Sequence, residues 1–96
     1  MPNFSVRVEV LNSQGFEYQH LHDAMENIGL LRTVVDSENK ELWLPFGIYY
    51  GTNYGTSGTV RDLVRDTVAN IGRQTRIFVV QDGAAWASNN LKVATG

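Results

Sequence analysis

The chain has 96 residues, a one-domain length, and 43% of them are hydrophobic, which is enough to build a modest core. It contains no cysteine, which excludes disulfides, thiolate metal sites and a cysteine nucleophile. The net charge of −2 argues against tight, sequence-independent nucleic-acid binding, because that binding is driven by phosphate neutralisation. The first residues lack a secretion signal, and no apolar stretch approaches the roughly 20 residues that span a bilayer, so we expect a cytoplasmic protein without a membrane partner.

Charge is distributed unevenly along the chain. Residues 1–48 carry three basic and seven acidic side chains, whereas residues 49–96 carry five basic and three acidic ones. The second half therefore has room for a basic strip. The alternative, favoured about two to one, is that Arg61-Asp62 and Arg65-Asp66 form the solvated face of a helix.

The first half of the chain predicts a strand and then a helix. Residues 4–10 alternate apolar and polar side chains without exception, which is the period of a half-buried strand. Four apolar residues then recur at spacings of three and four, which predicts one face of a helix. Ser13 is the expected helix cap, and Gly29 is placed for a left-handed C-terminal cap. The four apolar residues are Tyr18, Leu21, Met25 and Ile28.

The remaining chain predicts a hairpin, a second helix and a last strand. A strand is expected over residues 31–36 and another over 41–50, and Pro45 should mark a bulge, break or unpaired edge in the second one. After a loop at 51–58, a helix starts with Thr59 as its cap and ends at Gly72. A last strand is expected over residues 75–81. Beyond it, residues 84–93 either add a short strand around Trp86 or trail off.

The element order β-α-β-β-α-β predicts an α+β fold of the ferredoxin-like type, with a single domain over residues 1–96. Both helices are amphipathic, so they should cover one face of one antiparallel sheet and leave the other face open.

Strand alternation assigns side chains to that open face. If Leu42, Leu44 and Phe46 point inward and the register survives Pro45, the outward set includes an arginine and three aromatic rings, which is not a normal solvated surface. Such residues stack on single-stranded RNA bases, or they are buried in a homodimer. We favour the homodimer about two to one, because residues 40–45 lack the ribonucleoprotein consensus. The outward set is Arg7, Trp43, Tyr49 and Phe78.

The sequence contains no strong catalytic motif. His20 and His22 lie on nearly opposite sides of a helix and cannot share a metal ion, so neither a metal site nor a cofactor is expected, and a general acid–base role for one of them stays open. The loop at 51–58 precedes a helix and could bind an anion, with Tyr54 and Arg61 as recognition residues, although a simple connection is the favoured interpretation. Catalytic residues are not assigned.

Nuclease chemistry is constrained by the end of the first strand. Metal-dependent nucleases of ferredoxin-like fold commonly need a carboxylate there, and residues 11–13 read Leu-Asn-Ser. Metal-free RNA cleavage would instead need a base, an acid and a cation near the 2′-hydroxyl.

The chain resembles a family of small bacterial and phage proteins grouped with the GhoS antitoxin. The resemblance covers about three quarters of the chain. It rests on the first strand (residues 3–10), the Tyr18…Leu21-His22-Asp23-Ala24-Met25-Glu26…Gly29 helix, Arg32-Thr33, the Asp36-Ser37…Lys40 hairpin, Leu44-Pro45 and the Ile77-Phe78-Val79-Val80 strand. It implies a ferredoxin-like endoribonuclease that acts on the messenger RNA of a toxin in a type V toxin–antitoxin pair.

Three functional hypotheses follow. The first is an antitoxin-like RNA-binding protein, with metal-independent endoribonuclease activity as its extension. The second is a non-enzymatic protein-interaction module, a phage or mobile-element inhibitor or adaptor that binds a host or phage protein as a dimer. The third and weakest is a small-molecule sensor that uses the loop at 51–58.

Overall fold

The computed structural model describes residues 2–53, 55–82, 88 and 91–94 and contains two helices, one short 3₁₀ helix and five strands. The elements in chain order are β1 (Asn3–Val10), α1 (Phe16–Asn27), β2 (Thr33–Val35), β3 (Glu41–Trp43), β4 (Ile48–Thr52), α2 (Ser57–Val68), the 3₁₀ helix η1 (Ala69–Ile71) and β5 (Thr75–Asp82).

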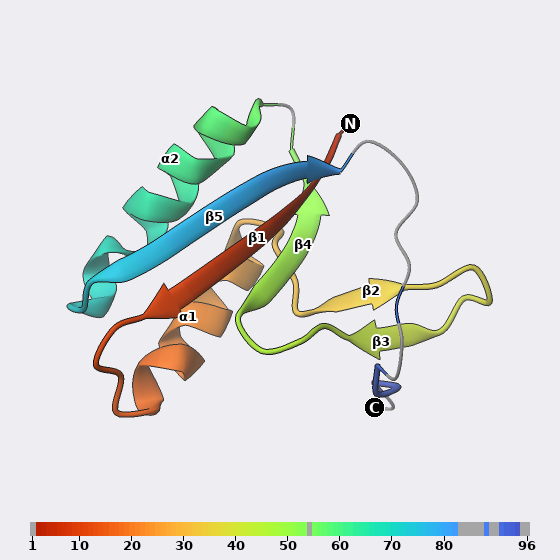
Figure 1. Cartoon of the computed structure of the whole chain (residues 1–96), viewed down its shortest axis with the longest axis horizontal. Coiled ribbons are helices and arrows are strands. Elements are labelled where there is room, and N and C mark those ends of the chain that lie inside the picture. Colours follow the sequence, from red (N-terminus) through yellow and green to blue (C-terminus); the bar gives the residue numbers. More distant parts are fainter. Residues whose placement is uncertain (1, 54, 83–87, 89–90, 95–96) are drawn as a thin grey trace.

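The strands form two antiparallel sheets. A three-stranded sheet has the order β4-β1-β5, and β2 and β3 form a separate two-stranded sheet. Both helices lie behind the three-stranded sheet in Figure 1, and its other face points toward the viewer. The predicted α+β class with two helices and antiparallel strands is confirmed, but the strands do not form the single sheet that the sequence predicted.

Pro45 divides the long strand that was predicted over residues 41–50. The Leu44 N–H still donates to the Arg32 carbonyl at 2.7 Å, but Pro45 has no N–H to continue the ladder. Gly47 follows with φ of 85°, and the Ile48 N–H donates to the Pro45 carbonyl at 3.1 Å, which closes a turn. β4 therefore leaves the hairpin and pairs with β1.

The two sheets stay connected through one residue pair. Leu31 and Tyr50 exchange two backbone hydrogen bonds of 2.9 and 2.8 Å, which places the start of the hairpin beside β4. The C-terminal segment also joins the hairpin, since the Trp43 N–H donates to the Lys92 carbonyl at 2.8 Å. The strand considered around Trp86 lies outside the described residues.

The core lies between the three-stranded sheet and the helices. The even-numbered side chains of β1 are all buried, as their alternation predicts, and they meet apolar side chains from one stripe of each helix. Tyr49 of β4 completes this cluster. The members from β1 are Phe4, Val6, Val8 and Val10; α1 contributes Leu21 and Met25, and α2 contributes Val60, Val64 and Val68.

Both helix starts differ from their predictions. α1 begins at Phe16 after Gly15, which has no side chain that could cap the helix. The predicted cap, Ser13, instead accepts a hydrogen bond from the Gly15 N–H at 2.9 Å. α2 begins at Ser57, and its cap is Thr56 rather than Thr59. Thr59 is the other half of a capping box, because its hydroxyl oxygen accepts from the Thr56 N–H at 2.7 Å.

Candidate functional site

Two of the predicted site residues, Arg7 and Phe78, meet on the uncovered face of the three-stranded sheet. They are register partners of neighbouring strands, β1 and β5. Directly opposed residues of an antiparallel pair point to the same face, so both side chains project away from the helices. The Phe78 side chain is 68% exposed, and Arg7 is exposed as well.

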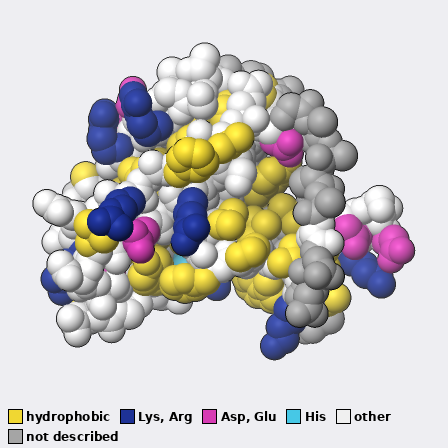
Figure 2. All heavy atoms as spheres, viewed as in Figure 1, with side chains coloured by type: hydrophobic (Ala, Val, Ile, Leu, Met, Phe, Trp, Pro, Cys, Tyr) yellow, Lys and Arg dark blue, Asp and Glu magenta, His cyan; other side chains and the backbone are white. Residues whose placement is uncertain are grey.

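Phe78 borders two hollows, and each hollow is lined by at least one arginine. A hollow of about 130 Å³ is lined by Arg7, Glu9, Arg76, Ile77 and Phe78. A second hollow, of about 240 Å³, borders the other side of Phe78 and reaches Arg61 at the start of α2. Figure 2 shows dark blue side chains along this side of the molecule, beside yellow hydrophobic ones. We call Arg7, Arg61, Arg76 and Phe78 the open-face cluster.

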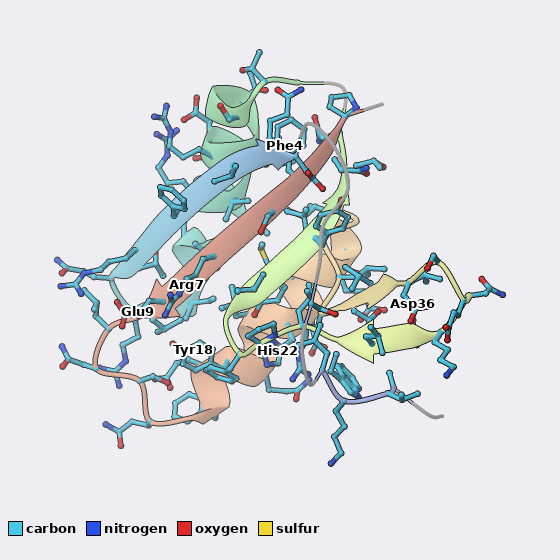
Figure 3. The ribbon with its side chains drawn as sticks, turned by 45° about the vertical axis from the view of Figure 1, so that its right-hand side comes forward. Phe4, Arg7, Glu9, Tyr18, His22 and Asp36 are labelled. Atoms are coloured by element: carbon cyan, nitrogen blue, oxygen red, sulfur yellow. The ribbon has the colours of Figure 1, made fainter. Side chains whose placement is uncertain are left out.

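The three arginines of this cluster differ in their partners. Arg76 forms an ion pair with Glu9 at 3.2 Å, and Arg61 forms one with Asp62 at 2.8 Å. Arg7 forms no ion pair or hydrogen bond within the described part of the chain. Figure 3 shows Arg7 and Glu9 close together at one end of β1. Arg7 is therefore the cation of this cluster that gives up no described intramolecular contact when it binds an anion.

Tyr50 is a further open-face residue. Its hydroxyl donates a 2.6 Å hydrogen bond to the Asp82 carboxylate. Burial, followed by the hydrogen bond and the negative charge of Asp82, raises the pKa of Tyr50 to about 12. The phenol is therefore a neutral donor near pH 7, and it holds Asp82 on this face.

The prediction that Tyr49 points outward is wrong. Tyr49 is the register partner of Val6 and is fully buried. The turn at Pro45 shifts the alternation of the chain, so odd-numbered β4 residues face the helices. The prediction that Phe46 points inward is also wrong, because Phe46 lies in this turn and is 64% exposed. Leu42, predicted inward, is buried.

Trp43 is exposed as expected, but it does not join the open-face cluster. It belongs to β3 in the separate hairpin sheet, and its ring lies 5.0 Å from the Arg32 guanidinium carbon. Tyr54, the other predicted recognition residue, lies outside the described residues. The structure thus brings together Arg7, Arg61 and Phe78 and separates them from Trp43 and Tyr49.

A hydrogen-bonded pair that the sequence did not predict joins α1 to β4. The Nδ1 atom of His22 lies 2.6 Å from the Tyr49 hydroxyl oxygen. Burial raises the pKa of Tyr49 above its ordinary range, so the phenol is neutral, and the imidazole tautomer decides which of the two groups donates.

His22 is held neutral by its surroundings. Burial and then the positive charge of Arg32 lower its pKa below the ordinary 6.5, against the opposing effect of Asp23. Tyr18 and His22 lie next to each other on α1 in Figure 3, and the Phe46 ring packs on Tyr18 with 4.6 Å between ring centroids.

His22 borders a groove of about 320 Å³ between α1 and the hairpin. Arg32 and Trp43 lie on its hairpin side, and three carboxylates surround them. These carboxylates oppose the approach of a phosphate, because like charges repel. Among the described residues no cluster of histidines and carboxylates is arranged to hold a metal ion. The carboxylates are Asp23, Glu26 and Glu41.

An ion pair with a buried carboxylate is a second feature that the sequence did not predict. Glu17 is buried and receives a 2.9 Å hydrogen bond from Arg73, along with hydrogen bonds from the Gln14 N–H and the Ser13 hydroxyl. Burial raises the pKa of Glu17, but the backbone and side-chain donors outweigh it and lower the pKa to about 2. The four-residue spacing of Ser13 and Glu17 was a signal for their own hydrogen bond, but not for the pair with Arg73. The role is structural, because the pair fixes the start of α1 to the segment after η1.

No protein-family model matches the sequence, and no curated protein matches it either. The described helices include none that is long and apolar enough to cross a membrane.

Proposed function

We propose that this protein binds single-stranded RNA through the open-face cluster, as an antitoxin-like RNA-binding protein. The observation that carries the proposal is the exposed Phe78 ring with Arg7 beside it in register and Arg61 and Arg76 at its two hollows. An exposed aromatic ring stacks on bases of any sequence, and arginines beside it contact the phosphates.

The charge of the cluster supports modest, salt-sensitive binding. Stacking of a base on Phe78 is worth about 1–3 kcal/mol. Three phosphate contacts would give a slope of roughly −2 in log K against log salt, by the usual −0.7 per contact for single strands. Glu9 and Asp62 make this slope shallower, because Arg76 and Arg61 must each exchange an existing ion pair for a phosphate. We therefore expect affinities of about 10⁻⁴–10⁻⁶ M, as in non-specific binding at physiological salt.

The choice of RNA and the antitoxin role rest on the resemblance of the chain to the GhoS family. The ferredoxin-like fold is part of the same proposal. Two observations support it: the order β4-β1-β5, and the Leu31–Tyr50 pair that brings the hairpin beside β4. Together they resemble one four-stranded arrangement whose third strand is broken at Pro45.

The test is fluorescence anisotropy with a labelled A/U-rich single-stranded RNA at low and moderate salt. We expect Phe78→Ala and Arg7→Ala to weaken binding, and Arg7→Ala to reduce the salt slope by about 0.7. Phe16→Ala is the aromatic control, because Phe16 is 62% exposed on α1, and Lys40→Ala is the charge control on the hairpin turn. Absence of binding, or binding that these controls reduce as much as Phe78→Ala does, contradicts the proposal. Tighter binding to the same sequence as single-stranded DNA argues against RNA as the ligand.

Cleavage of RNA is a second candidate function, favoured by the groove beside His22. The neutral His22 imidazole and the Arg32 cation both line this groove and would serve as the base and the cation of metal-free cleavage. The three carboxylates of the groove count against this candidate, because they repel the phosphates of RNA. The groove does not belong to the open-face cluster. Incubation of the RNA with EDTA present tests it: cleavage that disappears in His22→Gln and persists in His20→Gln supports this candidate, and intact RNA rejects it.

A further inference from the structure

Within the described residues, no strand covers the outer edge of β5. β5 pairs with β1 over all eight of its residues, and no other described strand pairs with it. Natural proteins usually protect such an edge with a proline, a bulge, a short strand or a covering segment. β5 contains no proline, its register with β1 is continuous from Thr75 to Asp82, and it lies at the outer side of the sheet in Figure 1.

Hydrogen bonding to β1 decides which backbone groups of β5 point outward. The Leu11 N–H donates to the Gln74 carbonyl at 2.9 Å, and the Val8 N–H donates away from β5, to Gly47. Odd-numbered β1 residues therefore bond to β5, and their partners on β5 are even-numbered. The odd-numbered residues Ile77, Val79 and Gln81 consequently present their N–H and C=O groups to the open edge.

We propose that the occupant of this edge is a second copy of the chain, paired antiparallel with β5 about a two-fold axis at Val79. Val79 then pairs with Val79 of the partner subunit, and Ile77 pairs with Gln81 of the partner subunit, so the outward backbone groups of these three residues are satisfied in both copies. This is an isologous contact, in which the same strand serves both subunits.

Side-chain complementarity selects the axis at Val79. It places Arg76 directly opposite Asp82 of the partner subunit, and Phe78 opposite Val80 of the partner subunit. All four of these side chains lie on the open face, since they share the parity of Phe78. Opposite charges and aromatic–β-branched pairs are both stabilising across strands.

Neighbouring axes lose that complementarity. A two-fold axis at Phe78 places Arg76 opposite Val80 of the partner subunit and Asp82 opposite Gln74 of the partner subunit. An axis at Ile77 shortens the paired segment and leaves Asp82 without an opposing β5 residue. Tyr50 supports the axis at Val79, because its 2.6 Å hydrogen bond holds the Asp82 carboxylate on the open face.

The dimer joins the two three-stranded sheets into one continuous sheet and brings the two α2 helices side by side. The partner's strand occupies the hollow beside β5 that Ser57, Gly58 and Arg61 line, so in the dimer RNA reaches Arg7 beside Phe78 rather than Arg61. The open faces of the two copies then form one surface, but the dimer does not depend on RNA. Its test therefore uses protein alone, so that its failure is distinct from failure of the proposed RNA binding.

Sedimentation velocity over a concentration series tests the interface by charge exchange. We expect the parent chain to dimerise, and Arg76→Asp and Asp82→Arg each to lose the dimer, because each variant opposes like charges at both ends of the contact. An equimolar mixture of the two variants restores it, since every opposed pair is again of opposite charge. A monomeric parent, or two variants that do not associate on mixing, overturns the proposal; so do single variants that remain dimeric.

Cross-linking gives a second measurement that does not depend on charge. The chain has no cysteine, so Phe78→Cys and Val80→Cys introduce single thiols. The opposed positions form a non-hydrogen-bonded pair with Cα atoms about 4.5 Å apart, which lies within the usual 4.4–6.8 Å of a disulfide. Mixing the two variants under mild oxidation should give a disulfide-linked dimer much faster than either variant alone. Equal rates would contradict the axis at Val79.

Discussion

The two faces of the three-stranded sheet are built from the same strands and follow different rules. On the covered face, Phe4 and Val6 are fully buried against the helices. On the open face, Arg7 and Phe78 are exposed although one of them is aromatic. Burial alone accounts for the covered face, whereas nothing in the stability of this domain requires an aromatic ring beside an arginine on the open one. The difference indicates that stability resides on one face and binding on the other.

The sharpest test of that difference compares two phenylalanines of the same sheet. Phe4→Ala leaves a cavity in the core and should lower the free energy of unfolding by about 3–5 kcal/mol. Phe78→Ala removes a side chain that is 68% exposed and should stay within about 0.5 kcal/mol of the parent. Urea unfolding followed by circular dichroism measures both. Similar losses for the two variants would mean that the open face also contributes to the core.

A second test concerns the space available on the covered face at β4. Gly51 is the register partner of Phe4, and a Cβ atom there would overlap the backbone carbonyl oxygen of Gly29. Gly51→Ala must move backbone and should destabilise by about 1–3 kcal/mol.

Gly58→Ala is the control for this test, because a Cβ there meets nothing closer than 3.7 Å. It should stabilise α2 by up to about 1 kcal/mol, since alanine favours the helix. Thermal unfolding of the two variants gives the comparison, and a Gly51→Ala protein as stable as the parent would show that the α1–β2 connection yields easily.

The covered face was largely predictable and the open face only in part, for a reason that Pro45 illustrates. Period-2 alternation depends on local sequence, so the buried residues of β1 and the positions of Arg7 and Phe78 followed from it. The orientation of Tyr49 depended on the number of residues in the turn at Pro45. Turn geometry and the pairing of β4 with β1 set that number, and neither can be read from alternation in the sequence.

Contacts between distant segments were also beyond the sequence analysis. Glu17 and Arg73 are 56 positions apart, and His22 and Tyr49 are 27 apart. Nothing local in the sequence marks such pairs. Helix periodicity placed Leu21 and Met25 inward, but it did not indicate which side chain would meet the His22 ring.

A third test compares two Glu–Arg pairs, one whose carboxylate is buried and one whose carboxylate is exposed. Because hydrogen bonding lowers the pKa of Glu17 to about 2 from 4.5, its contribution to stability is complete above pH 4.5 and is lost as the pH falls toward 2. Glu17→Gln cannot ionise, so it should be less stable than the parent at pH 7 and should lose less stability across that acidic window. Urea unfolding midpoints measured from pH 7 down to about pH 2 report both the lower stability at pH 7 and the smaller loss in acid.

The control for the acid test is Glu9→Gln. Glu9 pairs with Arg76 at 3.2 Å on the open face, where both side chains are well exposed. Such a pair is worth at most about 1 kcal/mol at pH 7. If Glu9→Gln changed the acid profile as much as Glu17→Gln, burial would not be what distinguishes the two pairs.

The smallest expected effect lies in the titration of His22. After burial, the charge of Arg32 is the next cause that lowers the pKa of His22, so Arg32→Gln should raise that pKa toward 6.5. Because the folded protein favours neutral His22, its free energy of unfolding decreases as the pH falls below 6.5. Arg32→Gln should lose less stability in that range, because its folded and unfolded His22 pKa values lie closer together. NMR titration of the imidazole carbons follows His22 directly. Arg7→Gln removes a charge from the opposite face of the sheet, and the same measurement should find His22 unchanged in it; a shift as large as that in Arg32→Gln would mean that the two faces are electrostatically coupled.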